Sequence, residues 1–533
     1  MSVTGGVSTW QTLEDASGDS RDPRHHLWIA FAASAVLVIA FLALPLSGTD
    51  LSAAVARADF ASRHAFAPID FSWFGGTNQF GYSLVSQYLM AVLGARPAGA
   101  LAAFVASCCF ATVLRRARVA HPLAGSLVGA FCIFANLVSG RIAFAIGIAF
   151  GLACLLALGS QSKRVAYPLA AALAVLCAGS SPVAGLFLLL CGVALLVTNR
   201  VRQGILLSCA TVTPMLVIGL VFGAGGWMQM TPADAITGVL TSLAVAAMVT
   251  SRTVRTGAVL AAGGIVLAYF VHTPVGANAI RLPVMFALPL IAGMTERPRW
   301  VMLATAAVVA ALNPPLVVSA LDDGGDPANY PAYYAALNAK LATLPHTGKI
   351  EVVMTPNYWE SVYVADKHLL ARGWLRQQDT AQNPLFFKNK APSAAAYERW
   401  LVDNGVAYVA LPSEVSWLGE AERRAVHTAA NQTGVGSLSQ IWGDEHWQLY
   451  RVVGSPGLVD GPASVARAND GTIKLSFSRP GTALLRVNYN RWLVASGDAC
   501  LADAYGWTEV NAPQAGPVAI TSSLRPSRPS ELC

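Results

Sequence analysis

The sequence predicts a polytopic α-helical membrane protein that carries an α/β unit and a β-sandwich in its carboxyl-terminal part. The first supporting observation is composition: 54% of the 533 residues are hydrophobic and only 12% are charged, whereas soluble chains average about 25% charged residues. The second is that residues 27–318 are nearly free of charge except in short clusters. The third is a change near residue 319, after which polar and charged residues recur as in a soluble domain.

Eleven apolar segments suit membrane spans. They are 27–46, 97–114, 120–138, 142–159, 166–180, 183–198, 204–222, 233–250, 256–271, 282–294 and 300–318. A helix needs about 20 apolar residues to cross a bilayer; several segments are shorter, so one pair could be re-entrant. The sequence therefore predicts a membrane domain of about eleven spans over residues 27–318. Residues 1–26 are polar and are expected to form a disordered cytoplasmic tail.

Basic residues mark every second connection between these segments. The clusters are Arg21/Arg24, Arg115/Arg116/Arg118, Lys163/Arg164, Arg200/Arg202, Arg252/Arg255 and Arg297/Arg299. Because Lys and Arg accumulate on the cytoplasmic side of a membrane, the amino terminus is predicted to be cytoplasmic and the carboxyl-terminal part extracytoplasmic. The same pattern accounts for the net charge of +7, so no nucleic-acid partner is expected. The predicted location is the plasma membrane.

A polar outer loop, residues 47–96, follows the first span. Its stretch Asp50–Gly94 carries acidic, basic, aromatic and glycine residues in a chain that is otherwise apolar. We expect this loop to hold an active site against the membrane surface. Asp59 and Asp70 are its candidate acids, although either could instead form a surface ion pair with a neighbouring arginine, which would contribute little energy.

Few ionisable residues occur in the later outer connections: Arg141, Asp234, His272 and Arg281. Each alone could be a helix-end residue that snorkels to the interface, and Asp234 fits the start of a helix. Their position on the face of the large loop nevertheless favours a shared polar cleft. Guanidinium groups bind phosphate through paired hydrogen bonds, so a cleft with Arg141 and Arg281 would suit a phosphate or diphosphate.

Residues 319–533 divide into a linker and two outer units. The linker, 319–346, begins with an acidic run that could hold a divalent cation but is more typical of a solvated connection. Strands and helices alternate over 347–455, which indicates an α/β domain. Short strands separated by Gly, Pro, Asn and Asp fill 456–533, which indicates a β-sandwich.

The nine cysteines show no metal-ligand spacing. Seven lie in predicted spans and read as small buried apolar residues. Cys500 and Cys533 lie in the outer part, an oxidising compartment, and are predicted to form a disulfide. No Ser-His-Asp order, GxSxG, P-loop or zinc spacing occurs. No metal ligand is therefore predicted, and a divalent metal ion is left open as a cofactor.

Several stretches resemble a group of actinobacterial integral membrane proteins, over nearly the whole chain. They are WFGGTNQFGYSL (73–84), GRIAFAIG (140–147), SSPVAGLFL (180–188), PVGANAIRLP (274–283) and ARGWLRQQD…NPLF (371–386). More loosely, in topology and in the position of the acidic loop, the chain resembles GT-C-type glycosyltransferases. This second resemblance implies a polyprenyl-phosphate sugar donor held in the membrane and a base in the first outer loop.

Under that resemblance, Asp59 is the first candidate base and Asp70 the second; the loop lacks the family's acidic pair. A carboxylate within hydrogen-bond reach must take the proton of the acceptor hydroxyl, and positive charge must stabilise the leaving lipid phosphate. Arg141, Arg281 and His272 are expected to bind that phosphate. Trp73, Asn78, Gln79 and Tyr82 of the loop are expected to bind substrate.

The leading hypothesis is therefore a membrane glycosyltransferase that transfers a sugar to a cell-envelope glycan or glycolipid at the outer face of the membrane. A transporter or flippase of lipid-linked envelope precursors is the first alternative, although no inverted repeat or charge within a span supports it. A non-catalytic envelope scaffold is the second.

Overall fold

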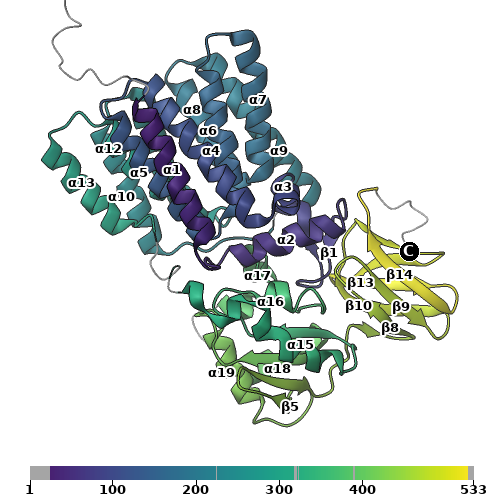
Figure 1. The fold of residues 1–533 in the computed structure, drawn as a ribbon. Coiled ribbons are helices and arrows are strands. Elements are labelled where there is room, and N and C mark those ends of the chain that lie inside the picture. The colour runs from purple at the N-terminus through teal and green to yellow at the C-terminus, as the bar shows by residue number, and fades with distance from the viewer. Residues whose placement is uncertain (1–24, 224, 317–320, 322, 388–390, 526–533) are drawn as a thin grey trace, which may run out of the picture.

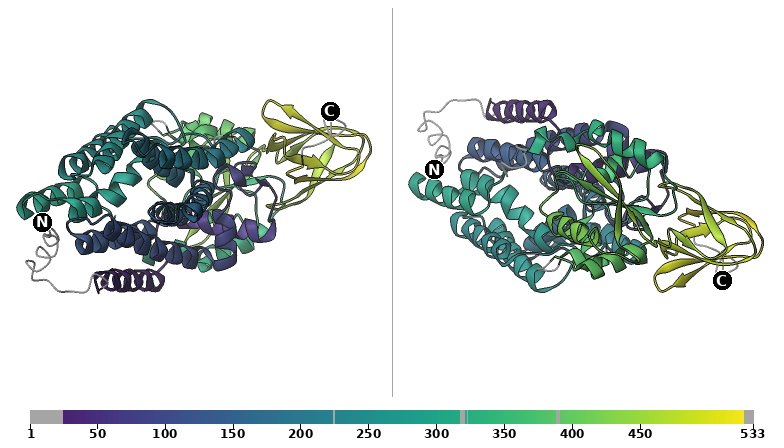
Figure 2. Two further views of the ribbon diagram at one scale, coloured as in Figure 1. Left: turned by 90° about the horizontal axis from the view of Figure 1, so that it is seen from above. Right: turned by 90° about the horizontal axis from the view of Figure 1, so that it is seen from below.

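A bundle of apolar helices forms one end of the molecule, and two smaller units lie at the other end (Figure 1). The computed structural model describes residues 25–223, 225–316, 321, 323–387 and 391–525. Seen from above and below, the α/β unit lies under the bundle while the β-rich unit projects to one side (Figure 2). The predicted fold class is confirmed; the number of membrane spans and the side of the outer units stay predictions.

Each predicted apolar segment coincides with or overlaps a helix. The helices are α1 (His25–Ala43), α4 (Ala95–Arg116), α5 (Pro122–Val138), α6 (Ile142–Leu158), α7 (Lys163–Ser180), α8 (Pro182–Val197), α9 (Val201–Val217, extended by the π-helix Ile218–Phe222), α10 (Pro232–Met248), α11 (Arg252–Phe270), α12 (Arg281–Met294) and α13 (Arg299–Leu312). By length and composition, five described helical stretches suit a membrane crossing: His25–Ala43, Ala95–Arg116, Val201–Phe222, Arg252–Phe270 and Gly276–Met294. Small residues allow close packing: a Cβ on Gly185 would lie 2.6 Å from Ala178 Cβ.

Alternate connections of the bundle lie at opposite ends. At the basic end, Arg116 Nη1 donates to Leu156 O (3.1 Å) and His121 N to Gly293 O (2.9 Å). At the other end, hereafter the loop end, Asp50 N donates to Ser139 O (3.4 Å), Leu84 N to Gly179 O (2.7 Å) and Met228 N to Thr273 O (3.0 Å). The carboxyl-terminal units also lie at the loop end (Figure 1). This segregation is what the alternating charge pattern requires.

The polar loop after α1 is folded rather than extended. It contains α2 (Leu51–Arg63), the antiparallel pair β1 (Ile69–Asp70) and β2 (Thr77–Asn78), a 3-10 turn (Gln79–Gly81) and α3 (Ser86–Leu93). Helix α2 buries Leu51, Ala54 and Phe60. It lies between the bundle and the carboxyl-terminal units, and Ser52 Oγ donates to Asn357 O (3.1 Å) in the α/β unit.

The α/β unit contains a four-stranded sheet in the order β3-β4-β6-β5. Strands β3 (Lys349–Val352) and β4 (Val406–Pro412) are parallel, and β6 (Trp447–Val452) and β5 (Leu438–Gly443) add antiparallel neighbours. The remaining elements are α16 (Glu360–Tyr363), α17 (Arg376–Gln382), α18 (Ala394–Asp403) and α19 (Glu420–Ala429). Every residue of β4 is buried, as expected for a central strand.

The last unit is a sandwich of two antiparallel sheets, ordered β12-β13-β10-β7 and β11-β14-β9-β8. The strands are β7 (Val459–Asp460), β8 (Ala463–Ala468), β9 (Ile473–Phe477), β10 (Gly481–Asn488), β11 (Leu493–Ala495), β12 (Cys500–Ala504), β13 (Trp507–Ala512) and β14 (Gly516–Ser522). Alternate residues of β9, namely Ile473, Leu475 and Phe477, are buried. This alternation is what a sheet with one face on a core requires.

The described part of the segment predicted as a linker is packed rather than solvated. It forms short 3-10 turns and α15 (Ala335–Ala342), and Tyr334 is fully buried. Asn329 is also fully buried and donates to Leu46 O (3.1 Å) and Asp323 O (2.6 Å). Its amide therefore ties the α/β unit to the segment that follows α1. Burial of aromatic side chains such as Tyr334 explains why this segment is packed.

Cys500 is disulfide-bonded. Its predicted partner, Cys533, lies outside the described residues, so this pairing stays a prediction. The seven remaining cysteines are free thiols, as expected for residues in apolar helices.

Candidate functional site

One carboxylate and two guanidinium groups meet at the loop end of the bundle. Asp50 Oδ2 lies 3.5 Å from Arg141 Nε and 3.5 Å from Arg281 Nη2. Asp50 is the residue before α2, Arg141 the residue before α6, and Arg281 the first residue of α12. Three separate parts of the chain thus place two positive charges against one negative charge.

The two guanidinium groups of Arg141 and Arg281 carry one more positive charge than the Asp50 carboxylate balances. Burial and the charge of Arg281 lower the pKa of Arg141 to about 10, although Asp50 opposes this shift. Arg141 Nε is buried and has no hydrogen-bond partner among the described residues. The 3.5 Å separations from Asp50 are also longer than strong charge-assisted hydrogen bonds. The pair therefore has unused capacity to bind an anion.

A third arginine, Arg57, lies on α2, seven residues after Asp50. Its side chain is buried and its guanidinium carbon is 4.3 Å from the centroid of the Tyr82 ring. Burial lowers the pKa of Arg57, while Tyr82 and Asp70 oppose this. Arg57 Nη2 is buried and, within the described ranges, has no hydrogen-bond partner.

Asp70, the second candidate base, is a buried acid in β1. Its Oδ1 accepts hydrogen bonds from Ser72 N (2.8 Å) and Ser72 Oγ (2.5 Å), and its Oδ2 accepts one from Gln79 Nε2 (3.1 Å). Burial raises the pKa of Asp70 to about 6, although the bonds from Ser72 favour the charged form. A carboxyl with such a pKa can exchange protons near neutral pH.

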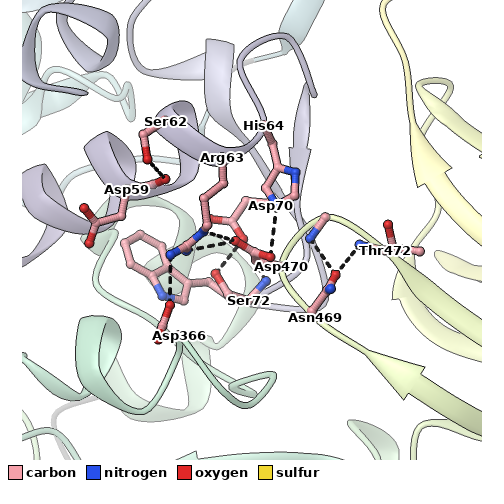
Figure 3. A network of polar contacts seen from close by, with 12 residues as sticks. Asp59, Ser62, Arg63, His64, Asp70, Ser72, Asp366, Asn469, Asp470 and Thr472 are labelled. Carbon is pink, nitrogen blue, oxygen red and sulfur yellow. Dashed lines mark hydrogen bonds and ion pairs between the residues drawn. The ribbon is translucent and has the colours of Figure 1, made fainter. Parts of the chain in front are cut away.

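Asp59, the first candidate base, lies at the edge of a contact between α2 and the β-sandwich (Figure 3). At the centre of this contact, Asp470 Oδ2 accepts from Arg63 Nε (3.1 Å) and Nη2 (2.9 Å), and Asp470 Oδ1 is 3.1 Å from His64 Nε2. Arg63 also bonds Asp366 (2.9 Å). The Asp59 carboxyl points away from Asp470; partial burial raises its pKa, and Arg63 opposes this.

The structure brings Arg141 and Arg281 together as expected, but around a different acid. Among the described residues, neither Asp59 nor Asp70 forms an ion pair with Arg141 or Arg281; Asp50 does. His272 is exposed and lies edge-on against the Trp227 ring, with 4.8 Å between the ring centroids, and among the described residues it forms no ion pair with Asp50.

The residues expected to bind substrate have separate environments. Trp73 is buried and donates to Ser361 O (3.0 Å), so it packs the loop against the α/β unit. Asn78 caps the 3-10 turn and donates to Phe222 O (3.2 Å), and Gln79 donates to Asp70. Tyr82 alone of the four contacts one of the three arginines, Arg57. The interdomain contacts of Trp73 could not be read from a sequence.

Two residues of this site were missed by the sequence interpretation, although signals for both were present. Asp50 lies four residues after the end of the first apolar segment, at Leu46, and precedes a helix-forming run, which is the usual place of a helix cap. Arg57 is seven residues later and therefore on the same face of α2. No group of three or more His, Cys, Asp or Glu side chains in the described part could hold a metal ion.

Comparisons with known proteins give only distant likenesses. No family model matches, and no curated protein matches. Among solved structures, the chain is similar to the arabinofuranosyltransferase AftD from Mycobacteria (TM-score 0.41, 12% identity, 95% of this chain and 57% of that chain). It is also similar to ArnT from Cupriavidus metallidurans bound to undecaprenyl phosphate (TM-score 0.44, 12% identity, 81% and 98%).

The chain thus spans little more than half the length of AftD. Both are similarities at low sequence identity to proteins described as an arabinofuranosyltransferase and as ArnT.

Proposed function

We propose that this protein is a membrane glycosyltransferase that uses a polyprenyl-phosphate sugar donor and glycosylates a cell-envelope glycan or glycolipid at the outer face of the plasma membrane. The observation that carries the proposal is the Asp50 carboxylate between Arg141 and Arg281 at the loop end of the bundle. An acid paired with excess positive charge at a lipid boundary suits transfer from a lipid-linked phosphate.

In the proposed reaction, the donor phosphate binds Arg141 and Arg281, with Arg57 as a third cation. Phosphate oxygens compete with Asp50 for the guanidinium groups, because the existing 3.5 Å contacts are long. The freed Asp50 carboxylate takes the proton of the acceptor hydroxyl. The acceptor oxygen forms a bond to the anomeric carbon while the bond between that carbon and the phosphate oxygen breaks. The electron pair of the broken bond leaves with the lipid phosphate.

Asp70 is the alternative base, because its pKa of about 6 suits proton transfer. Ser72 and Gln79 occupy both of its oxygens, however, which favours Asp50. Asp59 is the remaining candidate; it lies beside Arg63, the residue that bonds Asp470 of the sandwich and Asp366 of the α/β unit.

The proposed orientation places the basic end of the bundle in the cytoplasm and the loop end outside. The α/β unit and the sandwich then face the acceptor side. Both are anchored to the polar loop, through Trp73 and through Asp470 respectively, so their position relative to Asp50 is fixed.

The experiment compares Asp50→Asn, Asp59→Asn and Asp70→Asn in cells that lack the native protein, with envelope glycans analysed by mass spectrometry. We expect Asp50→Asn to lose the glycan product at unchanged protein level. Full function of all three variants would contradict the enzymatic proposal. A transporter would instead move labelled lipid-linked sugar across proteoliposomes without consuming it. A scaffold would tolerate all three substitutions but not deletion of residues 347–533.

A further inference from the structure

A cavity of about 830 Å³ lies inside the helical bundle and is lined mostly by apolar side chains of α4, α6, α8, α11 and α12. Its volume is in the range of sites that hold large organic ligands, roughly 300–1,000 Å³. At one extreme it reaches Leu282 and Pro283, next to Arg281; at the other it reaches the connections of the basic end. The cavity therefore extends along much of the bundle.

The charged residues that line this cavity are all cations at the basic end: Arg116, Lys163 and Arg200. Gln203, Ser251 and Thr253 add polar groups there. Among the described residues, no Asp or Glu lines the cavity, and neither Arg141 nor Arg281 does. The charged part of the cavity lining is thus at the end opposite the proposed active site.

Hydrogen bonds to carbonyl groups at helix ends use only part of the donor capacity of these cations. Arg116 Nη1 donates to Leu156 O (3.1 Å), and Lys163 Nζ donates to Ser160 O (2.8 Å) and Leu158 O (3.3 Å), near the end of α6. A guanidinium group has five N–H donors, so Arg116 retains donors after this contact. An apolar cavity with positive charge at one end and no lining carboxylate is complementary to a lipid with an anionic headgroup.

We propose that this cavity binds an anionic lipid from the membrane leaflet at the basic end. Its headgroup phosphate contacts Arg116, Lys163 and Arg200, and an acyl chain fills the apolar space between α8 and α11. Basic pockets between membrane helices on the cytoplasmic side are suited to such headgroups. This binding does not depend on the proposed sugar transfer, because none of its residues belongs to the Asp50 group.

The test is native mass spectrometry of the delipidated full chain with equal concentrations of dioleoyl phosphatidylglycerol and dioleoyl phosphatidylcholine. The two lipids have the same chains and differ in net headgroup charge. We expect the full chain to prefer phosphatidylglycerol by on the order of 100-fold, from about 1 kcal/mol for each of three cations. The triple variant Arg116→Gln, Lys163→Gln, Arg200→Gln should lose this preference.

A matched triple variant, Arg252→Gln, Arg255→Gln, Arg297→Gln, removes the same charge at the same end but alters no residue that lines the cavity. It should keep the preference. Gly257→Phe fills the cavity, since a Cβ on Gly257 would contact Leu190 (3.7 Å) and Ala194 (3.8 Å), and it should reduce binding of both lipids. Gly263→Phe on the same helix projects into open space and should leave the binding of both lipids unchanged.

Equal binding of the two lipids by the unmodified chain would overturn the proposal. So would equal loss in the two triple variants, or equal effects of Gly257→Phe and Gly263→Phe. Binding that survives the Arg116, Lys163 and Arg200 substitutions but is lost with Arg281→Gln would place the headgroup at the loop end. That result would refute this inference while leaving the proposed sugar transfer intact.

Discussion

Asp50 Oδ2 lies 3.5 Å from Arg281 Nη2, although the first residue immediately precedes α2 and the second begins α12. The same oxygen is equally distant from Arg141. The geometry of this ion-pair group therefore depends on the packing of the whole bundle. Because its ion pairs are long, substitutions within the group should change the rate of sugar transfer more than the free energy of unfolding.

Arg281→Gln should lower the rate of sugar transfer by roughly 100-fold or more, because a group that stabilises charge on the leaving phosphate is lost. Arg281→Lys should retain part of the rate, since it keeps the charge but not the planar fork of donors. Initial rates at saturating donor measure this. Arg255→Gln, at the basic end, is the control, and an unchanged rate in Arg281→Gln would refute the phosphate role.

Asp70 should make the stability of the protein depend on pH below neutrality. Its pKa is raised to about 6 in the fold and is about 3.9 in an unfolded chain. Between these values the folded state binds more protons, so this residue lowers stability as pH rises from about 4 to about 6, by roughly 3 kcal/mol in total.

Asp70→Asn should remove that dependence, because an amide resembles the protonated acid. Gln79 can turn its amide to suit the new donor, since Gln79 Oε1 has no partner among the described residues. Thermal unfolding in detergent from pH 4.5 to 7 measures the effect. Asp498→Asn, at an exposed position, should leave the pH profile unchanged, and an identical profile for Asp70→Asn would contradict the prediction.

Lys349 should have the opposite pH dependence. It is fully buried where the polar loop, the α/β unit and the sandwich meet: a Cβ on Gly75 would lie 2.9 Å from its Nζ, which is 4.7 Å from the Trp507 ring centroid. Burial and Arg486 lower the pKa of Lys349 to about 7. Between pH 7 and about 10.4 the unfolded state binds more protons, so this residue raises stability as pH rises.

Lys349→Met should therefore flatten the rise of melting temperature between pH 7 and pH 9.5 and should stabilise the protein most at the lower pH. Lys474→Met, at an exposed position of β9, is the matched control. A melting temperature that rises with pH as steeply in Lys349→Met as in the unmodified chain would contradict this assignment.

Arg372 is the central cation of the α/β unit. It is buried and pairs with Asp379 (2.7 Å) and Glu422 (2.6 Å), with Glu351 at 3.6 Å. Burial and Glu422 raise the pKa of Glu351 well above its usual range. Arg372→Leu should destabilise this unit by about 3–5 kcal/mol, because it leaves buried carboxylates without a cation.

Limited proteolysis and thermal unfolding measure the loss. Arg423→Leu is the control, since it breaks only the exposed pair with Glu420 (3.1 Å) and should cost under about 1 kcal/mol. Equal stability of the two variants would show that the buried pairs contribute little.

Charge and hydropathy were sufficient to predict the helices and to place Arg141 and Arg281 at one end of the bundle, because both signals depend on local sequence. Which acid of the loop meets these arginines depends instead on contacts between residues that are distant in sequence. Asp59 and Asp70 lie near Asp470, and only the folded sandwich brings that residue to α2. Likewise, the burial of Trp73 depends on its bond to Ser361 in the α/β unit.

Whether Asp50 is the base, as proposed, is decided by the rate of sugar transfer by Asp50→Asn. At matched protein level and melting temperature, the rate should fall by at least about 100-fold, while Asp59→Asn retains most of its activity. A rate for Asp50→Asn within about twofold of the unmodified protein would show that Asp50 is not the base.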